Sequence, residues 1–285
     1  MTRRISDLSQ IAGAYDAVVL DQWGVLHDGD APYPGAVAGV RTLAEAGTRL
    51  AVLSNSGKRA AVNAQRIAGI GFQPGLFETV MTSGEALWRD LAAGRVEMRR
   101  LLPIERAAGD AEAFCAGLAV TLSAELAEAE AVLLMGLPDD AAPDRFAALF
   151  DAALARGVPV ICTNPDRASP WAGGITVASP GALAHDFARR GGTVRFYGKP
   201  HEPVFDALAT ALGVPPARLL MVGDSLEHDI AGGHAAGWAT AFVRGGLHRA
   251  AFDGGAVEAV LDRLLDAEGA PPPDFTLDTI GGHHA

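Results

Sequence analysis

Residues 17–26, Ala-Val-Val-Leu-Asp-Gln-Trp-Gly-Val-Leu, begin as a short apolar run and leave it through a carboxylate. The run from Ala17 to Leu20 does not alternate with polar residues, as expected of a central parallel strand that is buried on both faces. Asp21 follows at its carboxyl end, and Gly24 allows a turn. The stretch therefore predicts a buried strand that delivers a carboxylate to the edge of a sheet.

Strand and helix patterns alternate on the C-terminal side of this stretch. The spacing predicts helices over 36–46, 58–69 and 84–93, and strands over 49–53 and 79–82. This alternation is typical of α/β proteins with a doubly wound parallel sheet. Such sheets bind ligands beyond the carboxyl ends of their strands, which is where Asp21 and Ser54 are expected.

The middle of the chain has an alternation of its own, from about residue 95 to 178, and the first pattern resumes near residue 194. We expect a core of residues 1–88 and 184–285, interrupted by a smaller α/β domain of residues 89–183.

The composition, with 49% hydrophobic and 20% charged residues among 285, predicts a well-buried core. The net charge of −11 argues against a nucleic-acid partner, because nucleic-acid binders display clustered Lys and Arg. Two cysteines suit a reducing compartment. No secretory signal is apparent at the start, and no uncharged apolar run reaches the ~20 residues of a membrane span. We expect a cytoplasmic protein without a membrane partner.

Three polar stretches follow predicted core strands: Asp21 to Leu26, Gly198-Lys199-Pro200, and residues 222–233, which contain Asp224 and Asp229. Magnesium takes oxygen ligands, and one or two carboxylates usually hold it together with substrate phosphate. A lysine can neutralise a transferring phosphoryl group, and an aspartate can attack it. The set therefore predicts phosphoryl-transfer chemistry.

Each of these residues alone has a more ordinary interpretation. Asp21 and Ser54 are common turn residues, Lys199 could be a surface lysine, and Asp229 could be a charge at a helix start. Their conjunction at the ends of several strands of one sheet favours a shared site.

With these motifs the chain resembles the haloacid dehalogenase (HAD) superfamily, in particular its class IIA, sugar-phosphatase-like branch. Asp21 with Gly24-Val25-Leu26 resembles the first motif, Ser54-Asn55 the second and Gly198-Lys199-Pro200 the third. The stretch from Gly223 through Asp229-Ile230 resembles the fourth. Cys162-Thr163-Asn164-Pro165-Asp166 resembles a class IIA cap segment that faces the active site, although Asn-Pro is equally a turn signal.

The resemblance implies a Rossmann-like core, an inserted cap and bound Mg²⁺. It implies Asp21, Ser54 and Lys199 as catalytic residues. It implies that Asp21, the Trp23 backbone carbonyl, Asp224 and Asp229 hold the metal, and that Asn55, Asn164 and Asp166 bind the substrate, a small phosphorylated metabolite. Class IIA relatives often pair through their caps, so a homodimer is also implied.

The chain departs from the family at residue 23. The family's usual first motif has a second Asp two residues after the nucleophile, which protonates the leaving group and then activates water, and here the residue is Trp23. An indole can perform neither step. His27 or Asp28 could substitute if the turn brought either back, whereas Trp23 itself could stack on a substrate ring or pack beneath the cap.

These observations predict a magnesium-dependent phosphatase that acts through an aspartyl-phosphate on a small phosphomonoester, such as a sugar phosphate. The alternative is a phosphate-ligand-binding regulator, or a slow phosphotransferase whose hydrolysis is impaired by Trp23. A dinucleotide-dependent redox enzyme is rejected, because Gly69-Ile70-Gly71 lacks a third glycine and follows a helix.

Overall fold

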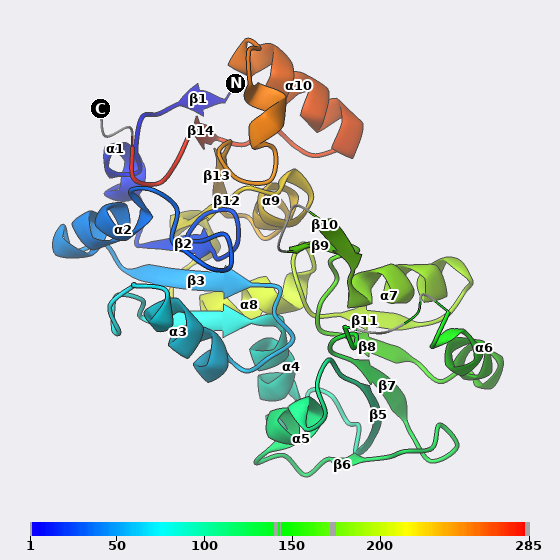
Figure 1. Ribbon diagram of the computed structural model, residues 1–285. Coiled ribbons are helices and arrows are strands. Elements are labelled where there is room, and N and C mark those ends of the chain that lie inside the picture. The colour runs from blue at the N-terminus through cyan, green and yellow to red at the C-terminus, as the bar shows by residue number, and fades with distance from the viewer. Residues whose placement is uncertain (1, 140–141, 143, 172–174, 283–285) are drawn as a thin grey trace. The chain divides into compact units, whose positions relative to one another are not determined.

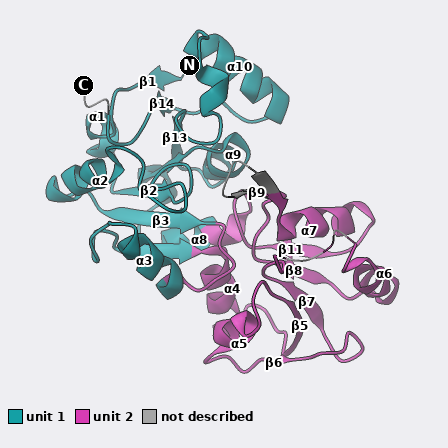
Figure 2. Cartoon of the chain, in the orientation of Figure 1, with its two compact units in different colours: residues 1–54, 61–81, 205–285 teal, residues 55–60, 82–204 magenta. Residues whose placement is uncertain are grey.

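The computed structural model describes residues 2–139, 142, 144–171 and 175–282, with the backbone alone for 169–171, 175 and 176. The chain forms two compact units (Figure 2). Unit 1 contains residues 1–54, 61–81 and 205–285, and unit 2 contains residues 55–60 and 82–204.

Unit 1 is built on a seven-stranded sheet with the order β1-β14-β13-β12-β2-β3-β4 (Figure 1). Its strands are β1 (Arg3–Arg4), β2 (Ala17–Asp21), β3 (Leu50–Ser54), β4 (Thr79–Thr82), β12 (Leu219–Gly223), β13 (Ala239–Val243) and β14 (Phe275–Leu277). The pairings among the first six strands in that order are parallel. The two ends of the chain thus contribute neighbouring strands to one sheet.

The central strand β2 is buried along its whole length, as its unbroken apolar run predicts. It pairs with β12, where Val222 is opposite Leu20, and with β3, where Leu53 is opposite Asp21. Asp21 and the end of β12 therefore emerge side by side at the same edge of the sheet.

The helices of unit 1 supply the rest of its core. They are α1 (Ser9–Ala12), α2 (Ala36–Glu45), α3 (Ala60–Gly69), α8 (Glu202–Leu212), α9 (Ala231–Ala235) and α10 (Val257–Glu268), with α3 and α8 each beginning in unit 2. Val40 of α2 and Ile67 of α3 pack with Val18 and Val52 in one cluster, and Leu261 of α10 packs with Phe242 in another.

Unit 2 contains a five-stranded parallel sheet with the order β11-β8-β7-β5-β6 and a two-stranded antiparallel pair, β10-β9. Its strands are β5 (Arg100–Ile104), β6 (Thr121–Leu122), β7 (Ala131–Leu134), β8 (Val160–Cys162), β9 (Ala168–Trp171), β10 (Ile175–Ala178) and β11 (Val194–Phe196), and its helices are α4 (Ser83–Ala92), α5 (Asp110–Cys115), α6 (Ala147–Arg156) and α7 (Pro180–Arg189). Phe150 of α6 and Phe187 of α7 pack with Val132 and Val160.

The prediction of an α/β fold with parallel sheets is confirmed. The expectation that the strand near residue 194 belongs to the core sheet is wrong, because β11 pairs with β8 in unit 2. A short strand pattern such as Val194-Arg195-Phe196 predicts a strand but does not say which sheet it joins. The borders of a functional cap at 88/89 and 183/184 stay a prediction, and the compact units divide at other residues.

Across the ranges given above, no helix has the length and apolar character needed to cross a membrane.

Candidate active site

Three carboxylates converge at the carboxyl edge of the unit 1 sheet. Asp21 ends β2, Asp224 directly follows β12, and Asp229 lies in the single π-helical turn Leu226–Ile230. All three are buried, and an oxygen of each lies within 4.8 Å of an oxygen of the others. The structure therefore brings together three of the predicted site residues, and we call them the carboxylate triad.

Two glycines make room for the triad. A Cβ on Gly24, which has φ +81°, would lie 1.7 Å from Asp224 Oδ2, and a Cβ on Gly223 would lie 2.1 Å from Asp229 Cγ. No side chain fits at either distance, and φ near +80° also favours glycine. Gly24 is therefore needed, because the turn of the first motif passes directly beside Asp224.

Backbone amides hold two of the carboxylates. The Ser225 N–H donates to Asp229 Oδ2 at 3.1 Å, and the Leu247 N–H donates to Asp224 Oδ2 at 2.7 Å. The Ser225 hydroxyl also accepts from the His228 N–H at 3.1 Å and caps the turn that carries Asp229. Hydrogen bonds to a charged acceptor are stronger than neutral ones, so these contacts orient the carboxylates.

The loop that supplies Leu247 was missed by the sequence analysis. It follows β13, the neighbour of β12 in the sheet, and begins Arg244-Gly245-Gly246. A polar exit with glycines after an apolar strand is the signal that identified the other motifs, and it is present here as well.

The triad fits a divalent cation. It offers only oxygen donors, and three buried carboxylates at such short separation repel one another unless positive charge or protons compensate. Magnesium binds oxygen ligands of this type. The donor set agrees with the metal that the resemblance implies.

Ser54 ends β3, one residue beyond the Leu53 that is opposite Asp21. The Ser54 residue is buried. Its strand is the immediate neighbour of β2 in a parallel sheet, so the hydroxyl leaves the same edge as Asp21.

Trp23 is packed within unit 1. A Cβ on Gly29 would lie 2.3 Å from Trp23 Cη2, the His27 ring meets the indole edge-on with centroids 5.5 Å apart, and the Arg66 guanidinium lies 5.2 Å above the Trp23 ring. Trp23 is half-buried and packs against its own loop and α3. These contacts lie within unit 1, so packing beneath the cap and stacking on a substrate both stay predictions.

His27 and Asp28 both have structural roles. His27 is fully buried, its Nδ1 accepts from the Gly29 N–H at 2.9 Å, and burial, helped by the Arg66 charge, lowers its pKa to about 4. Asp28 Oδ1 accepts from the N–H groups of Asp30 and Ala31 at 3.0 and 2.9 Å, and these bonds lower the pKa of its carboxyl. Neither side chain contacts the triad in any hydrogen bond that we observe for them.

Lys199, Asn55 and Asp166 come together in unit 2. Asn55 Oδ1 accepts from the Lys199 N–H at 2.7 Å, while Asn55 Nδ2 donates to the Lys199 carbonyl at 3.2 Å and to Asp166 Oδ1 at 2.6 Å. Asn164 Oδ1 accepts from the Asp166 N–H at 3.1 Å, as in an Asx turn. The Asn55 amide thus holds the main chain of Lys199 on both sides.

The predicted site residues are therefore divided between the two units. Asp21, Ser54, Asp224 and Asp229 belong to unit 1, and the Lys199 cluster belongs to unit 2. The joint action of Lys199 with Asp21 stays a prediction that rests on the third motif. The role of the Trp23 carbonyl stays a prediction that rests on the first motif.

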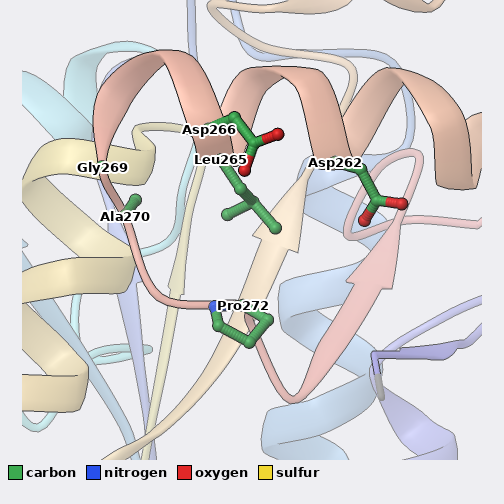
Figure 3. A pocket seen from close by; sticks show the side chains of 6 residues that line it. All are labelled: Asp262, Leu265, Asp266, Gly269, Ala270 and Pro272. Carbon is green, nitrogen blue, oxygen red and sulfur yellow. The ribbon is translucent and has the colours of Figure 1, made fainter.

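A hollow beside the C-terminal end of α10 is not the candidate site (Figure 3). It is lined by Asp262, Leu265, Asp266, Gly269, Ala270 and Pro272. None of the predicted site residues is among them.

Comparison with known proteins agrees with this geometry. A model of the haloacid dehalogenase-like hydrolase family matches residues 15–237, and a related HAD-hydrolase-like model matches residues 196–279. The rat protein chronophin is 30% identical over 97% of this chain and 96% of its own, and chicken glycerol-3-phosphate phosphatase is 29% identical over 81% and 80%.

A crystal structure of a haloacid dehalogenase-like hydrolase from Brucella suis 1330 superimposes with a TM-score of 0.79, at 28% identity, over 96% of this chain and 98% of that one. The first family model spans most of the chain, including the first, second, third and fourth motifs. The predicted resemblance is confirmed, and the chain belongs to the haloacid dehalogenase-like hydrolase family, in its class IIA branch.

Proposed function

We propose that this phosphoric monoester hydrolase is a magnesium-dependent phosphatase that cleaves a small phosphomonoester through an aspartyl-phosphate on Asp21. The observation that carries the proposal is the buried carboxylate triad at the edge of the sheet, with Ser54 at the end of the adjacent strand. The chicken relative is named a glycerol-3-phosphate phosphatase, which supports a small phosphorylated metabolite as substrate.

In the proposed first step, one Asp21 oxygen attacks phosphorus in line with the ester oxygen. The new Asp21 O–P bond forms as the P–O bond to the leaving group breaks, and the leaving alkoxide takes a proton from water. The Ser54 hydroxyl donates to one phosphoryl oxygen, and the Lys199 ammonium neutralises another. In the second step a water oxygen attacks phosphorus, the Asp21 O–P bond breaks, and inorganic phosphate leaves with the two protons of that water, which regenerates the Asp21 carboxylate.

Mg²⁺ held by Asp21, Asp224, Asp229 and the Trp23 carbonyl would supply compensation for the phosphoryl charge. The chain's own contribution is to keep the triad oriented, which the amides of Ser225 and Leu247 do. We further propose that Asn55, Asn164 and Asp166 shape the substrate side of the Lys199 loop. A cytoplasmic location and a homodimer through the cap stay predictions.

The presence of Trp23 in place of an acid/base residue supports a second candidate function, in which hydrolysis is slow. General acid–base catalysis is typically worth ~10²–10⁴-fold, and Trp23 cannot supply it. A chain that attacks good leaving groups and releases its aspartyl-phosphate slowly would behave as a slow phosphotransferase or as a phosphate-binding regulator.

The test is phosphate release from a panel of phosphomonoesters, with and without Mg²⁺, by wild type and by Asp21→Asn. Both proteins are first shown to be folded by circular dichroism. Metal-dependent release that is abolished in the variant supports the phosphatase. A phosphoryl adduct on Asp21 without multiple turnover, detected by mass spectrometry, supports the phosphotransferase. The covalent mechanism is overturned if no ester in the panel gives either an adduct or phosphate release.

A further inference from the structure

The loop after β13 is held rigidly at its base. The Arg244 residue is buried, and its guanidinium pairs with Asp278, with Nε donating to Asp278 Oδ1 at 3.0 Å. The N–H groups of Arg244 and Gly245 donate to the carbonyls of Leu277 and Asp278, each at 2.9 Å. Main-chain and side-chain contacts thus fix the loop to the strand β14.

The next two residues bring the loop against the triad. A Cβ on Gly246 would lie 2.2 Å from Asp224 Oδ2 and 2.6 Å from the Gly24 carbonyl, so the bare main chain lies directly on the first and fourth motifs. The Leu247 N–H then donates to the same Asp224 oxygen at 2.7 Å. The backbone position of residue 247 is therefore set by the site itself.

The Leu247 side chain is exposed despite this fixed backbone. Leu247 is 63% exposed, more than the other exposed large hydrophobic residues of the described chain, Val62 at 48% and Val177 at 37%. A single exposed apolar side chain is ordinary on a protein surface. Leu247 differs because its own amide binds a triad carboxylate, which places a leucine at the border of a site made of carboxylates.

We propose that Leu247 is a specificity-determining residue that contacts the organic part of the substrate and favours phosphomonoesters with an apolar or aromatic leaving group. The inference rests on the proposed function, because it assumes that the phosphoryl group binds at the triad. In the proposed arrangement, the leaving group of an ester bound at the triad lies beside Leu247, whose own N–H binds the Asp224 carboxylate.

The chemistry of the contact gives the direction of the preference. A leucine gains free energy when an apolar face covers it, whereas the hydroxyl groups of a sugar pressed against it lose water without gaining a hydrogen bond. An aryl phosphate matches this surface better than a polyhydroxylated one.

The experiment compares kcat/KM for phenyl phosphate and for glycerol phosphate in wild type, Leu247→Ser and a control, Val62→Ser. Val62 is an exposed apolar residue of α3 with no contact to the triad among those we observe, so the control removes the same kind of surface elsewhere. We expect Leu247→Ser to lower kcat/KM for phenyl phosphate about tenfold, chiefly through KM. The fall for glycerol phosphate should be much smaller, so the ratio of kcat/KM for phenyl phosphate to kcat/KM for glycerol phosphate should decrease at least about fivefold in Leu247→Ser, and Val62→Ser should leave this ratio unchanged.

Two results would overturn the proposal. An equal fall for both esters would mean that residue 247 acts only through Asp224, and no change for phenyl phosphate would mean that the side chain does not touch the substrate. A second measurement does not depend on turnover: the affinity of phenylphosphonate, in the presence of Mg²⁺, is measured by calorimetry for wild type and for Leu247→Ser. The proposed function fails only if the whole ester panel gives neither phosphate release nor an adduct on Asp21. If wild type hydrolyses neither of the two esters used here, unequal phenylphosphonate affinities of wild type and Leu247→Ser support the contact, and equal affinities refute it.

Discussion

The buried imidazole of His27 should make the free energy of unfolding depend on pH. In the folded protein burial holds the pKa of His27 at about 4, whereas its ordinary value is 6.5. The folded protein therefore binds fewer protons than the unfolded chain between these values. A base with a lowered pKa stabilises the fold above pH 6.5, and this contribution is lost as the pH falls toward 4.

The size of the effect follows from the two pKa values. Between pH 7 and pH 5 the unfolded imidazole becomes almost fully protonated while the folded one stays neutral, which lowers the free energy of unfolding by about 2 kcal/mol. Protonation in the folded state would also break the bond in which Nδ1 accepts from the Gly29 N–H.

The assay is urea unfolding of wild type and His27→Gln at pH 7 and pH 5, at constant ionic strength. We expect wild type to lose about 2 kcal/mol more than the variant between the two pH values, in the transition that unfolds unit 1. His248, whose pKa burial also lowers, is present in both proteins and cancels in the comparison. Equal pH dependence of the two proteins would refute the assigned environment of His27.

Two further substitutions test the geometry around the site. Gly246→Ala places a Cβ 2.2 Å from Asp224 Oδ2 and should weaken Mg²⁺ binding by at least about tenfold in a calorimetric titration. The control is Gly69→Ala, whose Cβ would have no atom within 4 Å and should leave the Mg²⁺ affinity unchanged. Equal Mg²⁺ affinities of the two variants would contradict the close approach of Gly246 to Asp224. Asn55→Ala removes three hydrogen bonds to Lys199 and Asp166 and should lower the free energy of unfolding by about 2–3 kcal/mol. Asn164→Ala removes only the bond from the Asp166 N–H and should cost less. A smaller loss for Asn55→Ala than for Asn164→Ala in urea unfolding would count against the Asn55 contacts.

The sequence was sufficient for those parts of the fold in which local pattern and topology agree. The apolar run before Asp21 and the one before Asp224 each predict a buried strand, and parallel strands in one sheet must bring their ends to one edge. The convergence of Asp21 and Asp224 follows from these two facts, whereas Asp229 reaches them through the π-helical turn Leu226–Ile230.

Other features depend on contacts between distant segments. The stretch Val194-Arg195-Phe196 predicts a strand, but its pairing with β8 depends on packing in unit 2. The hydrogen bonds of Asn55 reach residues 111 and 144 positions away in the sequence, and the indole of Trp23 packs against Gly29 and against Arg66 of α3. No local periodicity records such contacts.

The order in which strand β2 finds its neighbours has a consequence for biosynthesis. Strand β3 follows β2 closely, but β12 pairs with β2 from about 200 residues further along the chain, after all of unit 2. At a synthesis rate of ~5–20 residues per second, one edge of β2 waits on the order of 10–40 s for its partner. Unit 2 is then already complete on the ribosome, and Asp21 meets Asp224 only when the sheet closes. The part of the molecule that is proposed to do the chemistry is therefore among the last to form.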